Sequence, residues 1–92
     1  MPTKEQGKQA TGPAKRTHEQ RSDVIIGQLL QLLGRPVALY RVEVRHLWED
    51  HYRVNVFIGA DAASTRIVRS YFLAADQDGN ILASEPSITR QY

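Results

Sequence analysis

The sequence predicts a small α+β domain, with one N-terminal helix packed on one face of a three- to four-stranded antiparallel meander, in the order α-β-β-β-β. Three observations predict this fold. An apolar stripe with helical spacing stops abruptly at Gly34, a period-two alternation runs from Val37 to Gly59, and two shorter strand-like segments follow. The chain of 92 residues has room for one domain, and its one helix must cover the apolar face of the sheet.

Residues 1–20 are predicted to be a disordered basic tail, and residues 21–92 to form the single small α+β domain. The tail contains almost no apolar side chains, so burial cannot offset a chain entropy of about 1–2 kcal/mol per residue. Residues 1–21 hold five basic side chains against two acidic ones, whereas residues 22–92 hold seven against eight. The basic character of the protein therefore resides in the tail.

The composition excludes several classes of protein. The chain has no cysteine, so it has neither disulfides nor thiolate metal sites, which fits a reducing compartment. No segment approaches the roughly 18 consecutive apolar residues of a membrane-spanning helix, and the N-terminus lacks the apolar core of a signal peptide. We therefore expect a cytoplasmic protein that does not bind a membrane.

The helix is predicted from about Glu19 to Leu33, with Ser22 or Asp23 as its N-cap. Gly34 and Pro36 form a strong stop signal, because glycine adopts the left-handed conformation after a helix and proline cannot continue one. The apolar stripe that faces the sheet is predicted from i, i+3, i+4, i+7 spacing and comprises Ile26, Leu29, Leu30 and Leu33, widened by Ile25 and Leu32.

The alternating run is predicted to be a β-hairpin with strands at about Val37–Leu47 and Tyr52–Gly59, even-numbered residues facing inward. Two registers are open. One places Glu43 opposite Arg53 and needs a five-residue loop, whereas the other places Arg45 opposite Arg53. We favour the first register because like charges in opposite positions disfavour pairing.

A third strand is predicted from Arg66 to about Ala75, followed by a turn at residues 76–80 in which Gly79 takes a positive φ. A short fourth strand covers residues 81–84 and ends at Pro86, after which the last residues are expected to fray. If even-numbered residues of the third strand also face inward, its outward residues are Ile67, Arg69, Tyr71 and Leu73, and its inward ones are Val68, Ser70, Phe72 and Ala74.

The predicted open face of the sheet carries the candidate binding residues. Arginine and aromatic side chains on an open sheet can hold phosphates and stack on bases, and a basic tail adds non-specific phosphate contacts. The apolar members of the face instead favour a dimer or protein interface, and a plain solvated face is the third interpretation. The candidates are Arg41, Arg45, Arg53, Asn55, Phe57, Arg69 and Tyr71.

No set of residues stands out as catalytic. Ser64, Thr65 and Ser70 have no neighbouring base that the sequence identifies, and the glycines are too scattered to form a phosphate-binding loop. Trp48, at the hairpin tip, is interpreted as a lid on the core. We expect no enzyme activity and no cofactor.

Two parts of the sequence partly match metal-binding patterns, one for zinc and one for calcium. His46 and His51 could hold zinc if they converged, but the alternation points them to opposite faces. Residues 76–85 overlap a calcium-loop pattern, yet Ala74 occupies the position of its first carboxylate, so we interpret the segment as a hairpin turn.

These observations predict a small non-enzymatic interaction module that self-associates or binds a protein partner through its open sheet face. The alternative is a nucleic-acid-binding module that uses the arginine and aromatic side chains of that face together with the basic N-terminal tail.

Overall fold

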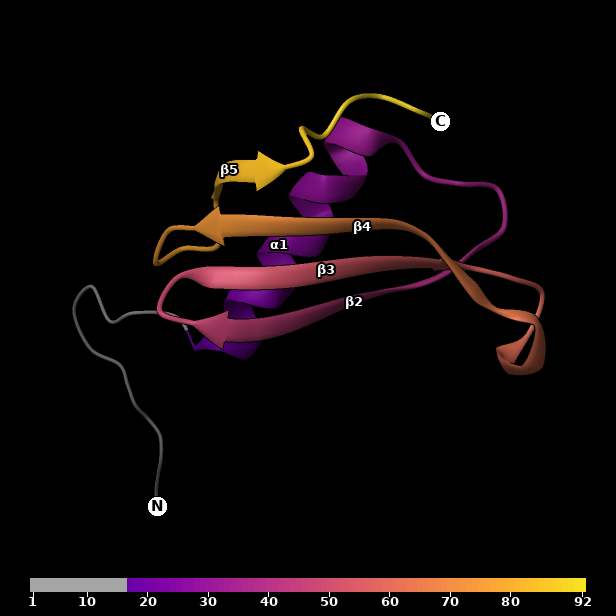
Figure 1. Cartoon of the computed structure of the whole chain (residues 1–92), viewed down its shortest axis with the longest axis horizontal. Helices are drawn as coiled ribbons and strands as arrows, with labels where there is room; N and C mark the ends of the chain where they lie inside the picture. Colours follow the sequence, from indigo (N-terminus) through magenta and orange to yellow (C-terminus); the bar gives the residue numbers. More distant parts are fainter. Residues whose placement is uncertain (1–16) are drawn as a thin grey trace, which may run out of the picture.

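A computed structural model describes residues 17–92 and confirms the predicted α-β-β-β-β fold. The elements are α1 (His18–Leu33), β2 (Leu39–Trp48), β3 (His51–Ile58), the 3₁₀ turn η2 (Ala62–Ser64), β4 (Arg66–Ala75) and β5 (Ile81–Glu85). The four strands form one antiparallel sheet in the order β2-β3-β4-β5. In Figure 1, α1 lies behind the strands, so the uncovered face of the sheet is turned toward the reader.

The helix begins at His18, within one residue of the predicted start, and its N-cap is Thr17, which forms a capping box with Gln20. The Thr17 hydroxyl oxygen accepts from the Gln20 N–H at 3.1 Å, and the Gln20 side chain accepts from the Thr17 N–H at 2.9 Å. Ser22 and Asp23 therefore lie inside the helix, and the prediction that either caps it is wrong. Gly34 ends the helix at φ 89°, as expected. The first helical turn belongs to the folded domain, whereas the rest of the predicted tail lies outside the described residues.

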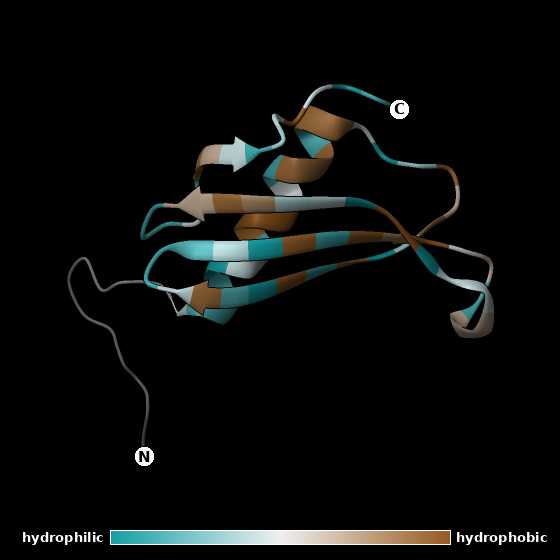
Figure 2. Ribbon diagram, viewed as in Figure 1, coloured by the Kyte–Doolittle hydropathy of each residue, from teal (hydrophilic) through white to brown (hydrophobic). Residues whose placement is uncertain are grey.

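The core lies between α1 and the two central strands. Ile25, Leu29 and Leu33 are fully buried, whereas Leu32 is 49% exposed. The buried stripe thus follows i, i+4 spacing and is narrower than predicted, because the helix meets the sheet along one line of side chains. Figure 2 shows apolar bands on both the helix and the strands. The sheet residues in the core are Tyr52, Val54, Val56, Tyr71, Leu73 and Ala75.

A register irregularity in β4 reverses the predicted facing of the residues that follow Val68, whereas Ile67 lies on the open face as predicted. Val56 pairs with Arg69 while Phe57 pairs with Ile67, so Val68 is an extra residue opposite that step. Beyond it, the odd-numbered residues of β4 face the helix. Since both alternating sets of this strand contain apolar side chains, the period-two pattern alone could not decide between them.

The favoured register of the β2–β3 hairpin is also wrong. The structure places Arg45 opposite Arg53 and closes the hairpin with two residues between Trp48 and His51. Asp50, in that turn, forms an ion pair with Arg21 of the helix at 3.0 Å. This long-range contact and the valine pairs of the core outweigh an arginine–arginine repulsion of about 0.2–1 kcal/mol.

The C-terminal residues do not fray as expected. The backbone N–H groups of Gln91 and Tyr92 both donate to the Leu33 carbonyl, at 2.8 and 3.1 Å. They thereby satisfy a carbonyl that the end of α1 would otherwise leave without a partner. No helix in the described part of the chain is long and apolar enough to cross a membrane.

Candidate binding surface on the open sheet face

The open face is the side of the sheet opposite α1. Five of the seven predicted candidates lie there, because they alternate along β2 and β3 with valines that pack in the core or against it. They are Arg41, Arg45, Arg53, Asn55 and Phe57. The register pairs Arg41 with Phe57 and Arg45 with Arg53, and it pairs Asn55 with Glu43.

The two candidates on β4 lie on the other side of the sheet, so their predicted outward placement is wrong. Tyr71 is 3% exposed and belongs to the core, and its burial raises the pKa of its hydroxyl. Arg69 pairs with the buried Val56 and donates to Gln91 at 3.1 Å. The extra residue at Val68 is the physical reason for both placements.

Two arginines face each other at the centre of the open face without a carboxylate between them. Arg53 donates to the Ser70 hydroxyl at 3.5 Å, a long contact, and Arg45 forms no ion pair with any described residue. The nearby Glu43 is directed elsewhere, toward Arg41 at 3.9 Å and Asn55 at 3.3 Å. The centre of the face is therefore positively charged.

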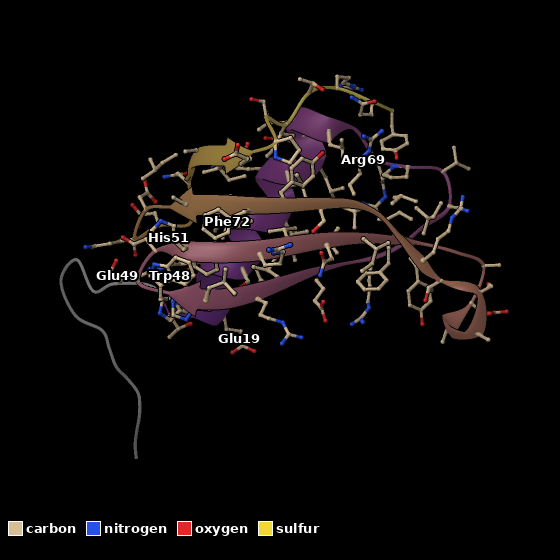
Figure 3. All side chains as sticks on the ribbon, viewed as in Figure 1. Glu19, Trp48, Glu49, His51, Arg69 and Phe72 are labelled. Carbon is tan, nitrogen blue, oxygen red and sulfur yellow. The ribbon has the colours of Figure 1, made fainter. Side chains whose placement is uncertain are left out.

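An aromatic row, formed by Trp48, His51 and Phe72, crosses three strands beside these arginines (Figure 3). The ring centroids are 5.0 Å apart for Trp48 and His51 and 5.6 Å apart for His51 and Phe72, and both pairs are stacked. Trp48 is 52% exposed, so its interpretation as a lid on the core is wrong. The alternation along β3, whose odd-numbered residues face outward, predicts His51 on this face. No pattern in the sequence predicted that Phe72 would lie there as well.

A shallow cavity of about 180 Å³ extends the aromatic row toward β5. It is lined by His51 and Phe72 of the aromatic row, by the small side chains of Ala74 and Ala83, and by Glu85. At the opposite end of the face, the Arg41 guanidinium lies over the Phe57 ring at 4.8 Å.

A second cluster of polar side chains fastens the start of α1 to the β2–β3 hairpin, on the helix side of the sheet. Arg21 donates to Asp50 at 3.0 Å and to the Tyr52 hydroxyl at 3.4 Å. A hydrogen bond of 2.7 Å joins His18 Nδ1 to the same hydroxyl, and the His18 ring stacks on His46 with centroids 3.6 Å apart. These contacts are structural, and they show that His18 is part of the domain rather than of a tail.

This cluster predicts a pH dependence of stability. Burial, followed by the nearby His46 and Arg21, lowers the pKa of His18 below its ordinary value of 6.5. The unfolded chain therefore takes up a proton first, so the contribution of neutral His18 is complete above pH 6.5 and is lost as the pH falls through the folded-state pKa. We expect the melting temperature to fall on acidification from neutral pH to about pH 5, and to fall less in His18→Gln.

His51→Gln is the matched control for this prediction, because His51 lies on the opposite face of the sheet. Thermal melts followed by circular dichroism would provide the comparison. An equally steep loss of stability in His18→Gln and in the wild type would contradict the assignment of the pH dependence to this cluster.

The residues of the zinc and calcium patterns have structural contacts in the fold. His46 and His51 lie on opposite faces, as predicted. Asp76 accepts from the backbone N–H groups of Asp78 and Asn80, both at 2.9 Å, and these bonds, those of Asn80 first, lower its pKa. The segment is a hairpin turn, as predicted. Within residues 17–92, no group of three or more histidine and acidic side chains is arranged to hold a metal ion.

Comparisons with protein-family models, curated proteins and solved structures gave no significant match to this chain. The fold and the surface together define a small α+β domain with an open sheet face that is rich in arginine and aromatic side chains.

Proposed function

We propose that this protein is a non-enzymatic binding module that holds an anionic partner, a single-stranded nucleic acid, on its open sheet face. The observation that carries the proposal is the Arg45–Arg53 pair beside the aromatic row. Two cations in opposite positions with no described counter-ion favour a partner that supplies negative charge.

The chemistry of the face fits nucleic acid in two ways. Arginine forks match phosphate oxygens, and the exposed ring of Trp48 can stack on a base, an interaction of about 1–3 kcal/mol per base. An open sheet can hold the unpaired bases of a single strand directly on its surface, so that no groove is needed. The five basic side chains of residues 1–21 add attraction that does not depend on sequence.

A second candidate is a protein partner, including a second copy of this chain, bound through the same face. The observation that favours it is Ile67, which is 51% exposed and lies opposite Phe57. Tyr71 and Leu73, which were predicted to contribute apolar area to this face, lie in the core instead. The smaller apolar area is why we place this candidate second.

The test uses Trp48, the one tryptophan of the protein, as a fluorescent reporter on the face itself. Short single-stranded DNA and RNA oligonucleotides are expected to quench its emission. The double variant Arg45→Gln, Arg53→Gln is expected to bind about tenfold to hundredfold more weakly, with a logarithmic salt slope that is smaller by about 1 to 1.5.

Arg35→Gln is the matched control, because Arg35 is an exposed arginine on the loop after α1, and it should retain wild-type affinity. Replacing Lys4, Lys8 and Lys15 with glutamine should weaken binding at low salt yet leave the quenching at saturation. Equal affinity for the wild type and the double variant would overturn the proposal. A concentration-dependent dimer with no oligonucleotide binding would support the second candidate instead.

A further inference from the structure

A notch lies beside the first half of β4, where no described strand pairs with its β5-facing edge. β5 pairs with β4 only from Phe72 to Ala75, so the preceding half of β4 has no strand on that side. The C-terminal residues 86–92 run past this gap. Between them is a cavity of about 350 Å³, lined by residues 68–71 of β4 and by Pro86, Ser87, Thr89 and Gln91. We call this cavity the β4 notch.

Arg69, which is labelled in Figure 3, lines the β4 notch and supplies it with a positive charge. Its Nη2 group donates to the neutral Gln91 side chain at 3.1 Å, and its Nε atom is buried without a hydrogen-bond partner. No ion pair joins Arg69 to any carboxylate in the described part of the chain. The guanidinium lies over the Tyr92 ring at 6.0 Å from the centroid, a contact that fills none of its N–H groups. The half-buried guanidinium therefore lacks further hydrogen-bond partners among residues 17–92, while its charge is present at any physiological pH.

The other polar side chains of the notch can also donate. Thr89 accepts from the Gln91 side-chain amide at 2.9 Å, which leaves its own hydroxyl hydrogen available, and Ser87 carries a second hydroxyl. No acidic residue lines the cavity. A cavity with one cation, several hydroxyl donors and no carboxylate is complementary to an anion.

We propose that the β4 notch binds a small phosphate ester, whose oxygens accept from the Arg69 guanidinium and from the hydroxyls of Ser87 and Thr89. A tetrahedral phosphate has three oxygens that can accept from donors on different sides, and the notch offers donors both from β4 and from the C-terminal segment. Its volume leaves room for the organic part of an ester. The notch is distinct from the Arg45–Arg53 pair, since Arg69 lies on the helix side of the sheet. The two sites share only Ser70, which lines the notch and whose hydroxyl accepts from Arg53.

The competing interpretation is that Arg69 only secures the C-terminal segment. Its partner Gln91 is itself bound to the Leu33 carbonyl, and a cation near the C-terminal end of α1 is favourable on its own. A purely structural Arg69 would affect the melting temperature without binding phosphate. Ser87→Ala separates the two roles, because Ser87 is exposed and forms no hydrogen bond that the fold requires.

The experiment is an amide NMR titration of the full chain with phenyl phosphate, with inorganic phosphate and with acetate. We expect saturable shifts in residues 68–71 and 86–91, stronger for phenyl phosphate than for inorganic phosphate and weakest for acetate. Arg69→Gln should weaken phosphate binding at least about tenfold and Ser87→Ala severalfold, whereas Arg66→Gln, on the same strand but outside the notch, should not.

The open-face variant Arg45→Gln, which leaves every residue of the notch and its contacts in place, should bind phenyl phosphate as the wild type does. The absence of saturable shifts, shifts centred on the open face, or unchanged binding in both Arg69→Gln and Ser87→Ala would each overturn the proposal. Shifts caused equally by acetate and by phenyl phosphate would show general anion attraction and would overturn it as well.

Discussion

Leu73→Ala is expected to lower the free energy of unfolding by about 2–5 kcal/mol, whereas Phe72→Ala should cost much less. Leu73 is 1% exposed in the core, so its truncation leaves a cavity. Phe72 lies on the open face, half-buried beside His51, and its truncation removes a surface stack. A core of this size supplies only about 3–5 kcal/mol, so Leu73→Ala should be largely unfolded at room temperature.

Urea unfolding followed by circular dichroism compares these neighbouring residues directly. The two variants also test the facing of β4, because an uninterrupted alternation with even-numbered residues inward would reverse their order. If Phe72→Ala proved the more destabilising, Tyr71 and Arg69 would belong on the open face and Phe72 in the core. Phe72→Ala should in addition alter the fluorescence of Trp48, whose ring centroid is 5.8 Å away.

Gly79→Ala is the second change with a large expected effect, a loss of about 1–3 kcal/mol. Gly79 has φ +90°, where a side chain is strained, and a Cβ there would lie 2.8 Å from both the Arg21 carbonyl oxygen and Val24 Cβ. Since these contacts belong to α1, the substitution would push the β4–β5 turn away from the helix.

Gly27→Ala is the matched control, because it is the same substitution at a glycine with no neighbour within 4 Å of the added Cβ. Within a helix, alanine is favoured over glycine by about 0.5–1 kcal/mol, so this variant should be more stable than the wild type. Thermal melts of both variants give the comparison. A stability gain in Gly79→Ala would contradict the packing of the turn against the helix.

Local signals in the sequence were sufficient for the elements of the fold. Gly34 and Pro36 mark the end of α1, because their backbone chemistry acts without help from the rest of the chain. Strand β4 was predicted at its observed bounds, Arg66–Ala75, and Gly79 takes the positive φ that the turn requires. The capping box was missed because Thr17 stands beside a polar segment with no apolar periodicity.

Long-range contacts determined what the sequence could not indicate. The hairpin register depends on Asp50 meeting Arg21 of the helix, a contact 29 residues apart that no local pattern encodes. The same holds for the facing of β4, where a single extra residue at Val68 reverses the strand. The arginines of β2 and β3 were placed correctly because valines alternate with them without interruption, whereas Arg69 and Tyr71 lie beyond the irregularity.

The most direct test of the open face as a binding surface is an amide NMR titration of the full chain with a short single-stranded oligonucleotide at moderate salt. We expect the largest shifts in β2 and β3 around Arg45 and Arg53, together with the Trp48 indole signal, and small ones in α1. Shifts confined to the basic N-terminal residues, or no shifts under conditions where the chain dimerises, would contradict the proposal that the open sheet face binds nucleic acid.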